Sequence, residues 1–394
     1  MWDAVVVGAR CAGASAAMLL AKRGRRVLLV DRATFPSDTM STLYVHQPGV
    51  ALLDRWGVLD SVVASGCPPL ATLKSVVQDV ELRGPVARYG TVTANYAPRR
   101  YILDQLLIDA AVAAGAEFAD ATSLSEVLWE DGRAAGVRLR TKDGTETAER
   151  TGLVIGADGK RSRVAELVGA PYVVEDPSVS CVYYTGWTGM LCGFETRVRN
   201  GSGMAVVPTN DGVTFVITYF PQESFRAIKI NPTKAHLGCV RALAPDLFEQ
   251  VSAGEQAVRL QGTGDQRNFF RKANGPGWAL IGDAGLHLDS ITAQGITHAF
   301  IQASLLSECL GDDLGDRERV DDALARFASQ TRNLLADEYK RTLEAASLHI
   351  PDSRLEMLRE ISRDPVLTER YFALLAGIIS IDDFLTPELA GILR

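Results

Sequence analysis

The sequence predicts an α/β fold that combines a parallel sheet and a β-meander with a mainly antiparallel sheet and a helical C-terminal region. Three observations support this prediction. The chain opens with an apolar run, a small-residue helical stretch and a second apolar run, which is the order of a parallel β-α-β unit. Apolar residues alternate with other residues over much of 179–271, and beyond residue 319 the pattern is helical.

The opening unit predicts a strand at 4–7, a helix at 12–23 closed by Gly24, and a strand at 27–30 that ends on Asp31. Three further helices follow, and the longest has leucines spaced three and four apart before a glycine ends it. We expect these helices at 48–56, 60–64 and 101–114.

Two Asp-Gly turns, which begin at Asp131 and Asp143, lie between strand-like runs and predict an antiparallel meander over 123–149. We expect another, separate strand at 153–157. Alternate residues from 213 to 219 are apolar and follow a hairpin turn, so they predict a strand of the antiparallel sheet.

The last third of the chain returns to the α/β pattern. A short apolar strand at 278–281 precedes a helix at 295–309. The remainder is predicted to be helical, with breaks at Pro351, Pro365 and Pro387.

Length, charge and cysteine content indicate how many domains, which partners and which location to expect. The chain has 394 residues, more than one hydrophobic core usually organises, so we expect two or more domains. A formal net charge of −7 argues against a nucleic-acid partner. Six cysteines without a C-x-x-C pair favour reduced thiols. With no basic leader and no apolar run of bilayer length at the N-terminus, we expect a cytoplasmic protein without an integral membrane segment. The oligomeric state stays open.

A glycine-rich turn, Gly8-Ala9-Arg10-Cys11-Ala12-Gly13, lies between the first strand and the first helix. There, a turn directs backbone N–H groups and a helix N-terminus at a pyrophosphate, as in Rossmann-type domains. Asp31 ends the next strand, close to the spacing expected of an acid that binds an adenosine ribose hydroxyl. Arg10 replaces the middle glycine of the usual pattern, so the turn alone leaves a plain strand–turn–helix unit as an alternative.

Two later segments strengthen the prediction of a dinucleotide site. Gly156-Ala157-Asp158-Gly159 and Gly282-Asp283-Ala284-Gly285 each put an aspartate at the end of a buried strand, and Ala293-Gln294-Gly295 follows the second. Open α/β sheets bind their ligands at this carboxyl edge.

With these three segments in this order, the chain resembles the class A FAD-dependent monooxygenases of the para-hydroxybenzoate hydroxylase type. Geranylgeranyl reductases and flavin-dependent halogenases are relatives in the same wider group. The resemblance covers about residues 3–310. It implies a Rossmann-type FAD-binding domain with one non-covalent FAD, and NADPH or NADH as a transient reductant.

The resemblance also implies residue roles. Asp31 would hold the adenosine ribose, Asp158 would lie by the pyrophosphate, and Asp283 would bond the ribitol chain. Arg100, in an Arg-x-x-Leu element, would contact the cofactor, and 291–296 would place N–H groups at the pyrimidine edge of the flavin. The predicted cofactor set is Gly8, Arg10, Cys11, Ala12, Gly13, Asp31, Arg32, Arg100, Asp158, Gly159, Gly282, Asp283, Gln294, Gly295 and Ile296.

The chain departs from the family pattern where the flavin ring would lie. Gly285 and Leu286 replace an Ala-His pair, and a histidine appears one place later, at His287. Ser290 stands where the family has a proline beside the flavin, and Ala293 replaces a glycine. His287 and Ser290 are the candidate catalytic residues, although His287 also fits a loop histidine bonded to backbone.

Other side chains allow two interpretations. His46 either faces the cofactor or starts a helix, and Arg99 either faces solvent or lies at the substrate mouth. Cys11 is interpreted as a small residue near the pyrophosphate rather than a redox group. His287, Asp289 and His298 match no metal-ligand spacing, so we expect no metal site. Some of the aromatic residues in the antiparallel region are expected to line a substrate pocket, the candidates being Tyr183, Tyr184, Trp187, Phe215 and Tyr219.

The sequence therefore predicts an NAD(P)H-dependent FAD monooxygenase that uses O2, through a flavin hydroperoxide, to hydroxylate or epoxidise a small aromatic or polyketide-like substrate. The alternative is a C=C reductase of the geranylgeranyl reductase type, which Ser290 favours. A halogenase is less favoured because Trp-x-Trp-x-Ile-Pro is absent, and a non-catalytic flavin-binding module is the remaining alternative.

The cofactor segments bracket the antiparallel region, which predicts a discontinuous cofactor domain. We expect the FAD domain at 1–70, 96–172 and 272–325, the substrate domain at 71–95 and 173–271, and a helical region at 326–394.

The sequence generates a first prediction: the purified protein is yellow and releases intact FAD when denatured, because no motif marks a covalent attachment residue. Absorbance spectra of the native protein and of the supernatant after denaturation check this. A colourless protein that takes up no added FAD would refute the prediction.

Overall fold

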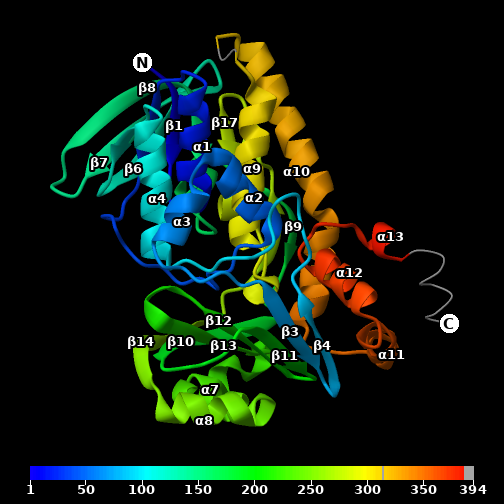
Figure 1. Cartoon of the computed structure of the whole chain (residues 1–394). Coiled ribbons are helices and arrows are strands. Elements are labelled where there is room, and N and C mark those ends of the chain that lie inside the picture. Colours follow the sequence, from blue (N-terminus) through cyan, green and yellow to red (C-terminus); the bar gives the residue numbers. More distant parts are fainter. Residues whose placement is uncertain (313–314, 386–394) are drawn as a thin grey trace.

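The computed structural model describes residues 1–312 and 315–385, so the break predicted at Pro387 lies outside the described residues. Two large sheets lie one above the other in Figure 1, and a long helix, α10, runs along one side. The predicted α/β class, with a Rossmann-type sheet, a meander, an antiparallel sheet and C-terminal helices, is confirmed.

The upper sheet in Figure 1 has eight strands and contains the opening β-α-β unit. Its parallel part has the order β17-β8-β1-β2-β5, while β16 pairs antiparallel with β17, and β7 and β6 extend the sheet from β8. Its strands are β1 (Trp2–Val7), β2 (Val27–Val30), β5 (Glu117–Ala119), β6 (Thr122–Glu130), β7 (Arg133–Thr141), β8 (Glu146–Gly156), β16 (Asn274–Gly275) and β17 (Trp278–Leu280).

Strand β8 changes partners along its length. Residues 146–150 pair antiparallel with β7, and residues 151–156 pair parallel with β1. The buried strand expected at 153–157 is the end of β8, so the meander and the parallel sheet share one continuous strand. Sequence alternation does not reveal which partner a strand has, so the exchange left no signal.

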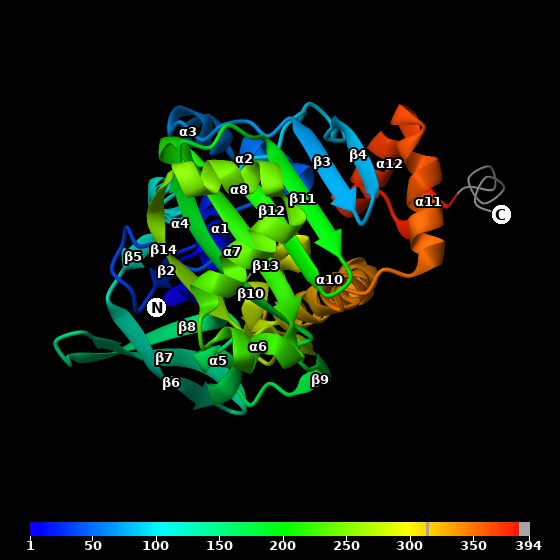
Figure 2. The ribbon, with the colours of Figure 1, turned by 90° about the horizontal axis from the view of Figure 1, so that it is seen from below.

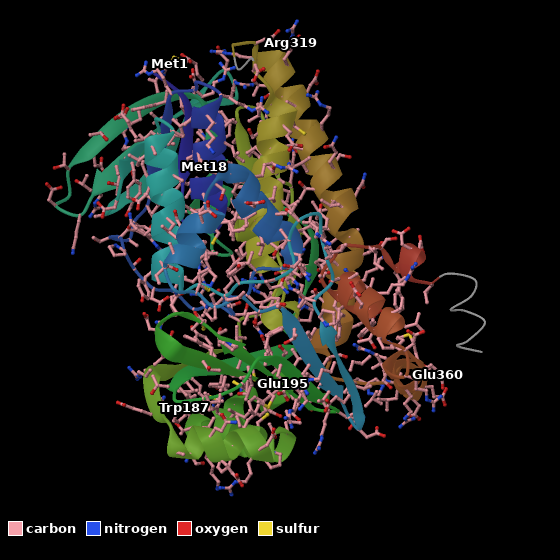
Figure 3. All side chains as sticks on the ribbon, viewed as in Figure 1. Met1, Met18, Trp187, Glu195, Arg319 and Glu360 are labelled. Carbon is pink, nitrogen blue, oxygen red and sulfur yellow. The ribbon has the colours of Figure 1, made fainter. Side chains whose placement is uncertain are left out.

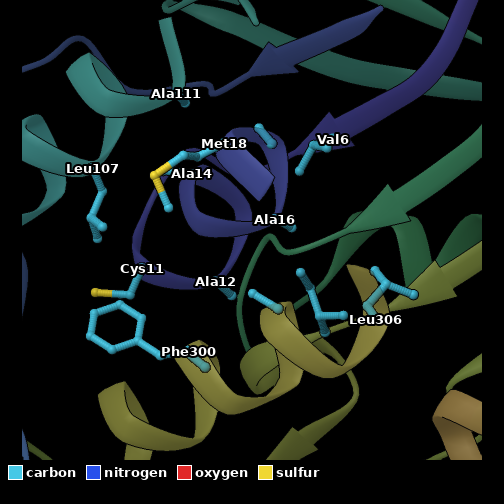
Figure 4. Packing of buried hydrophobic residues seen from close by; sticks show 14 of the residues in the cluster. Val6, Cys11, Ala12, Ala14, Ala16, Met18, Leu107, Ala111, Phe300 and Leu306 are labelled. Carbon is cyan, nitrogen blue, oxygen red and sulfur yellow. The ribbon is translucent and has the colours of Figure 1, made fainter. Parts of the chain in front are cut away.

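Helices cover one face of this sheet and the meander covers the other. On β1, Ala4 and Val6 belong to the core shared with α1, α4 and α9, whereas Val5 and Val7 pack with the meander. Figure 4 shows the helical side, where Met18, Leu107 and Phe300 lie around α1. The helices near this sheet are α1 (Cys11–Lys22), α2 (Gln47–Trp56), α3 (Leu59–Ala64), α4 (Arg100–Ala113), α5 (Arg163–Leu167) and α9 (Gly295–Leu310).

The lower sheet has seven strands in the order β14-β10-β13-β12-β11-β3-β4. All neighbours are antiparallel except β11 and β3, which are parallel. Its strands are β3 (Thr72–Val77), β4 (Val80–Pro85), β10 (Ser180–Thr188), β11 (Phe194–Arg199), β12 (Ser202–Pro208), β13 (Val213–Pro221) and β14 (Glu255–Thr263).

Three helices within the region predicted as sheet were missed: α6 (Phe225–Ile228), α7 (Pro232–Leu243) and α8 (Pro245–Ala253). Asn231 caps α7 through Lys234 N, and a proline opens each of α7 and α8, which are helix-start signals that the alternation-based interpretation passed over. Figure 2 shows α7 and α8 across the outer face of the sheet. In Figure 3, Trp187 and Glu195 lie in this lower part of the molecule, far from Met18.

A third sheet is small and has three strands. Its strands are β9 (Tyr172–Asp176), β15 (Asn268–Arg271) and β18 (Leu286–His287), in the order β18-β15-β9. The described residues also form four short 3-10 helices: η1 (Asn210–Gly212), η2 (Gln222–Ser224), η3 (Gly282–Ala284) and η4 (Ser290–Thr292).

The C-terminal helices are α10 (Arg317–Ala346), α11 (Asp352–Ser362), α12 (Pro365–Leu375) and α13 (Ile381–Phe384). The predicted breaks at Pro351 and Pro365 are confirmed, because Pro351 precedes α11 and Pro365 opens α12. Figure 2 shows α11 and α12 beside β3 and β4, where Leu358 and Phe372 join the same core as Leu82. No helix in residues 1–312 or 315–385 is both long and apolar enough to cross a bilayer.

Candidate functional site

One cavity of about 850 Å³ is lined from both large sheets. All the predicted cofactor and catalytic residues border it except Gly13, which packs behind the glycine-rich turn. Its other border includes Val182, Tyr184 and Ile217 of the seven-stranded sheet. We call the part lined by Val182, Tyr184, Ile217, Thr263, Gln266 and residues 287–290 the substrate half.

The glycine-rich turn is built for close approach. Gly8 has a φ of +103°, and a Cβ there would lie 2.4 Å from the carbonyl oxygen of Ala157. A Cβ on Gly13 would lie 1.7 Å from the carbonyl oxygen of Gly8. Arg10, in contrast, has a φ of −91°, which any L-residue adopts. The backbone conformation at this position therefore does not require glycine.

The side chain of Arg10 turns toward Asp104, a carboxylate in α4 that is fully buried. Arg10 donates to it at 2.6 Å, Arg100 donates at 2.9 and 3.1 Å from Nη2, and the thiol of Cys11 lies 3.3 Å away. Burial alone would lower the pKa of Arg100, but the charge of Asp104 raises it above its ordinary value. Burial raises the pKa of Cys11, so this thiol stays protonated, as expected for a packing residue.

Two of the predicted cofactor aspartates hold backbone turns. Asp31 accepts from Ala9 N and Ala33 N, each at 2.8 Å. Asp158 accepts from the Ser162 hydroxyl at 2.5 Å and from the N–H groups of residues 163 and 164, at the start of α5. Burial raises the pKa of Asp158. Both aspartates border the cavity, and their direct contacts with a cofactor stay predictions.

Asp283 differs from them because its carboxylate is exposed in the cavity. Among the residues that the structure describes, none forms a hydrogen bond or ion pair with it, and Arg100 acts on it only through charge. Gly282, beside it, has a φ of +58°, and a Cβ there would lie 2.8 Å from the Cβ of Ala12.

Helix α9 points its N-terminus at the same cavity. No side chain caps α9, and Gly295 in its first turn is open to the cavity, with no atom near an added Cβ. The preceding Ala293 has a left-handed φ of +53°, a conformation that costs an alanine roughly 1–2 kcal/mol. Gln294 donates to the Leu375 carbonyl at 3.0 Å, which ties this loop to the end of α12.

These features fit an FAD. The first turn of α1 also has no side-chain cap, so the cavity meets two helix N-termini with free N–H groups, which suit a pyrophosphate and the electron-rich edge of a flavin. The unpaired carboxylate of Asp283 lies on the same cavity and is a free acceptor for hydroxyl groups.

The seven-stranded sheet presents one face of β10 and β13 to the cavity. Tyr184 borders it, while Phe215 borders an adjoining cavity of about 100 Å³. The Tyr219 hydroxyl donates to the Ser290 carbonyl at 3.0 Å. Tyr183 and Trp187 lie on the other face, where Tyr183 meets Phe225 and Trp187 packs with α7 and α8. Alternation along the strands thus divides the candidate aromatic residues.

The candidate catalytic residues lie in the substrate half, His287 at the end of β18 and Ser290 at the start of η4. His287 Nδ1 is 2.5 Å from the Arg267 carbonyl, and its ring stacks on Phe269. The Ser290 hydroxyl donates to Gln266 Oε1 at 2.7 Å. Gln266 in turn donates to Asp289, whose side chain also accepts from Ser180 at 2.6 Å.

Asp289 is a carboxylate that is only 2% exposed. Burial raises its pKa to about 6, against the opposing effects of the Ser180 hydroxyl, the Ile291 N–H and the charge of Lys160. Nothing in the sequence distinguished it or Gln266, because their contacts join segments far apart in the chain. Asp104 had a weak signal: an acid four residues after Arg100, on an otherwise apolar helix face.

The structure decides between the two interpretations of His46 and of Arg99. His46 precedes α2, is buried and bonds the Thr292 carbonyl through Nε2 at 3.1 Å, outside the cavity lining; burial lowers its pKa to about 4. Arg99 does not face solvent, since its side chain is 13% exposed, pairs with Asp38 at 2.7 Å and lies over Phe215.

Within residues 1–312 and 315–385, no group of three or more histidine, cysteine or acidic side chains is placed to hold a metal.

Comparisons with known proteins place this geometry in context. A family model described as "FAD binding domain" matches residues 1–332. The chain is 25% identical over 369 residues to digeranylgeranylglycerophospholipid reductase 1 of Methanopyrus kandleri, with 88% of each chain covered. It is 24% identical to a menaquinone reductase of Mycolicibacterium smegmatis, over 87% of this chain and 82% of that one.

Solved structures share the fold. A flavin-dependent brominase superposes with a TM-score of 0.82 at 15% identity, over 100% of this chain and 98% of that one. A probable FAD-dependent monooxygenase from Pseudomonas aeruginosa superposes with a TM-score of 0.72 at 20% identity, over 95% and 99%. At these identities the likeness concerns the fold.

We predict that Asp283→Ala lowers FAD affinity about ten- to a hundredfold, because a carboxylate bonded to ribitol hydroxyls contributes roughly 1.5–3 kcal/mol. Titration of the apoprotein with FAD measures this. Asp54→Ala, which removes an exposed carboxylate away from the cavity, is the control. Equal affinities in the two variants would show that Asp283 is misassigned.

We also predict that Asp104→Asn destabilises the protein by about 3–5 kcal/mol, because it leaves the buried Arg100 without a counter-charge. Thermal and denaturant unfolding measure the change. Asp109→Asn, on the exposed side of the same helix, should stay within about 0.5 kcal/mol of the wild type. If both variants were equally stable, Asp104 would not be the organising group of this end of the cavity.

Proposed function

This chain belongs to the family of FAD-binding-domain proteins, and from that premise we propose that it is an FAD-dependent monooxygenase. NAD(P)H would reduce the flavin, and one oxygen atom of O2 would enter a small aromatic or polyketide-like substrate by hydroxylation or epoxidation. Only one glycine-rich β-α-β unit occurs in the part of the chain that the structure describes, so NAD(P)H would bind transiently. We also propose a cytoplasmic location, where NAD(P)H is available.

The observation that carries the proposal is the shared, compact cavity. At about 850 Å³ it lies in the upper part of the range for ligand pockets, roughly 300–1,000 Å³, yet it has to accommodate both FAD and substrate. Because cofactor residues and the substrate half border one cavity, a small substrate in that half would lie directly beside the flavin. The substrate half supplies Val182, Tyr184 and Ile217 as an apolar wall and Thr263 and Ser290 as neutral polar groups.

FAD supplies the electron transfer and the oxygen chemistry when it is bound. The chain's own residues bind, orient and exclude water. The N–H groups of the first turn of α1 would bind the pyrophosphate, and Asp283 would accept from the ribitol hydroxyls. The N-terminus of α9 would favour negative charge on the pyrimidine edge. Val182 and Ile217 would keep water from the reacting centre.

A flavin-dependent C=C reductase is the second candidate, and two observations favour it. The chain is 25–26% identical over most of its length to digeranylgeranylglycerophospholipid reductases. Ser290 stands where a proline is expected, and its hydroxyl is bonded to Gln266, so the wall beside the flavin differs from that of the hydroxylases that the sequence resembles.

A halogenase is the least favoured. It would have to bind a halide anion beside its substrate, and the substrate half contains the buried carboxylate of Asp289 and no lysine or arginine among its lining residues. Repulsion between like charges is strong in a site from which water is excluded. The fold shared with a brominase therefore does not by itself favour halogenation.

We predict that turnover consumes one O2 per NAD(P)H and places label from isotopic O2 in the product. Mass analysis of the products from a panel of neutral phenols and polyketide-like compounds measures this, with an oxygen-free reaction as the control. We also expect some hydrogen peroxide to form, because serine lacks the rigid ring of proline. Ser290→Pro should lower that amount if the backbone accepts a proline there, where it would lose the 3.4 Å bond from Ser290 N–H to Gln266.

A product that gained two hydrogen atoms and no label, formed equally well without oxygen, would contradict the monooxygenase and support the reductase.

A further inference from the structure

The charges that border the cavity are unevenly distributed. Every lysine and arginine of its lining comes from the cofactor side, that is, from the glycine-rich turn, the end of β2, the start of α4 and the turn after β8. They are Arg10, Arg32, Arg100, Lys160, Arg161 and Arg163.

Nearly all of these cations are already paired. Arg10 and Arg100 share Asp104. Lys160 and Arg161 share Asp265, at 3.6 and 2.8 Å. Arg163 pairs with Glu166 at 2.8 Å, and Arg32 follows Asp31 on the adenosine side of the site. Outside this lining, Arg99 near the adjoining small cavity is bound to Asp38.

The substrate half has the opposite character. Asp289 lies within it, 2% exposed, with its carboxylate held by Ser180, Gln266 and the Ile291 N–H. No ion pair to Asp289 exists among the described residues. The cation whose charge reaches it is Lys160, which Asp265 already holds. A carboxylate buried in this way, without a counter-ion, projects its charge into the cavity with little screening.

We propose that the substrate half selects uncharged molecules, and that Asp289 is the specificity-determining residue that excludes anions. The substrate class is then a neutral phenol, quinone or polyketide whose hydroxyl or carbonyl group meets Thr263, Ser290 or Tyr184, and whose rings meet Val182 and Ile217. This inference rests on the proposed function for the kind of substrate, but the charge selection concerns binding alone.

The effect of pH on anion binding depends on Asp289 and on the other charged or titratable groups that lie near it. His287 on β18 borders the same half, and Lys160 and Asp265 lie on the neighbouring turns. The Tyr219 hydroxyl stays neutral because burial raises its pKa. Between pH 8 and pH 5 the protonation of Asp289, whose pKa is about 6, removes the negative charge.

The test uses the FAD-loaded protein in its oxidised state, without NAD(P)H. Benzenesulfonamide, which stays neutral from pH 5 to 8, and benzenesulfonate, which stays ionised over the same range, are titrated separately while the flavin absorbance is followed. At pH 8 we expect the sulfonamide to bind at least roughly tenfold more tightly than the sulfonate. In Asp289→Asn, which keeps the shape, the sulfonate should gain about tenfold and the sulfonamide should change less than about twofold.

The pH dependence of the wild type provides a second measurement if Asp289→Asn loses FAD. Lowering the pH from 8 to 5 should strengthen sulfonate binding in the wild type, because Asp289 becomes protonated, and should leave sulfonamide binding nearly unchanged. Equal binding of the two probes at pH 8, failure of the neutral probe to bind, or an unchanged sulfonate affinity in Asp289→Asn would overturn the inference. Because no turnover is involved, a failure of oxygen incorporation would refute the proposed reaction and leave the charge selection standing.

Discussion

The buried carboxylate of Asp104 is the constraint on which the cofactor end of this molecule depends. It lies four residues after Arg100 in α4 and receives both that guanidinium and Arg10 of the glycine-rich turn. The side chain of Arg10 is thereby held against α4, while its backbone keeps an ordinary φ. A position that usually requires glycine can then carry arginine, and the N–H groups of α1 remain open to the cavity.

The other aspartates of the cavity act according to what already binds them. Asp31 and Asp158 are occupied by N–H groups of their own turns, so they shape the backbone that faces the ligand. Asp283 has no such partner and remains available to a ligand. Asp289 is held in a neutral network and keeps its charge in the substrate half. Burial and bonding thus assign four residues of one type to different tasks, and Asp289 is the one whose charge makes the substrate half disfavour anions.

Sequence reasoning succeeded where structure is set locally. The strand at 27–30 and the helix boundaries at Pro351 and Pro365 follow from apolar runs, glycines and prolines within a few residues. It failed at β8, where long-range pairing decides and the strand exchanges partners midway. Gln266 and Asp289 escaped for the same reason, because Ser180, 109 residues from Asp289, completes their network. Sequence reasoning also passed over the local start signals of α7 and α8, which lie within a region dominated by alternation. The predicted domain limits and the individual cofactor contacts stay predictions.

A crystal structure of the FAD-loaded protein tests the central claim most directly. The account predicts one FAD per chain, with its pyrophosphate against the first turn of α1, its ribitol beside Asp283 and its ring between the N-terminus of α9 and the wall of Val182 and Ile217. A flavin bound elsewhere, or with its ring turned away from the seven-stranded sheet, would contradict it.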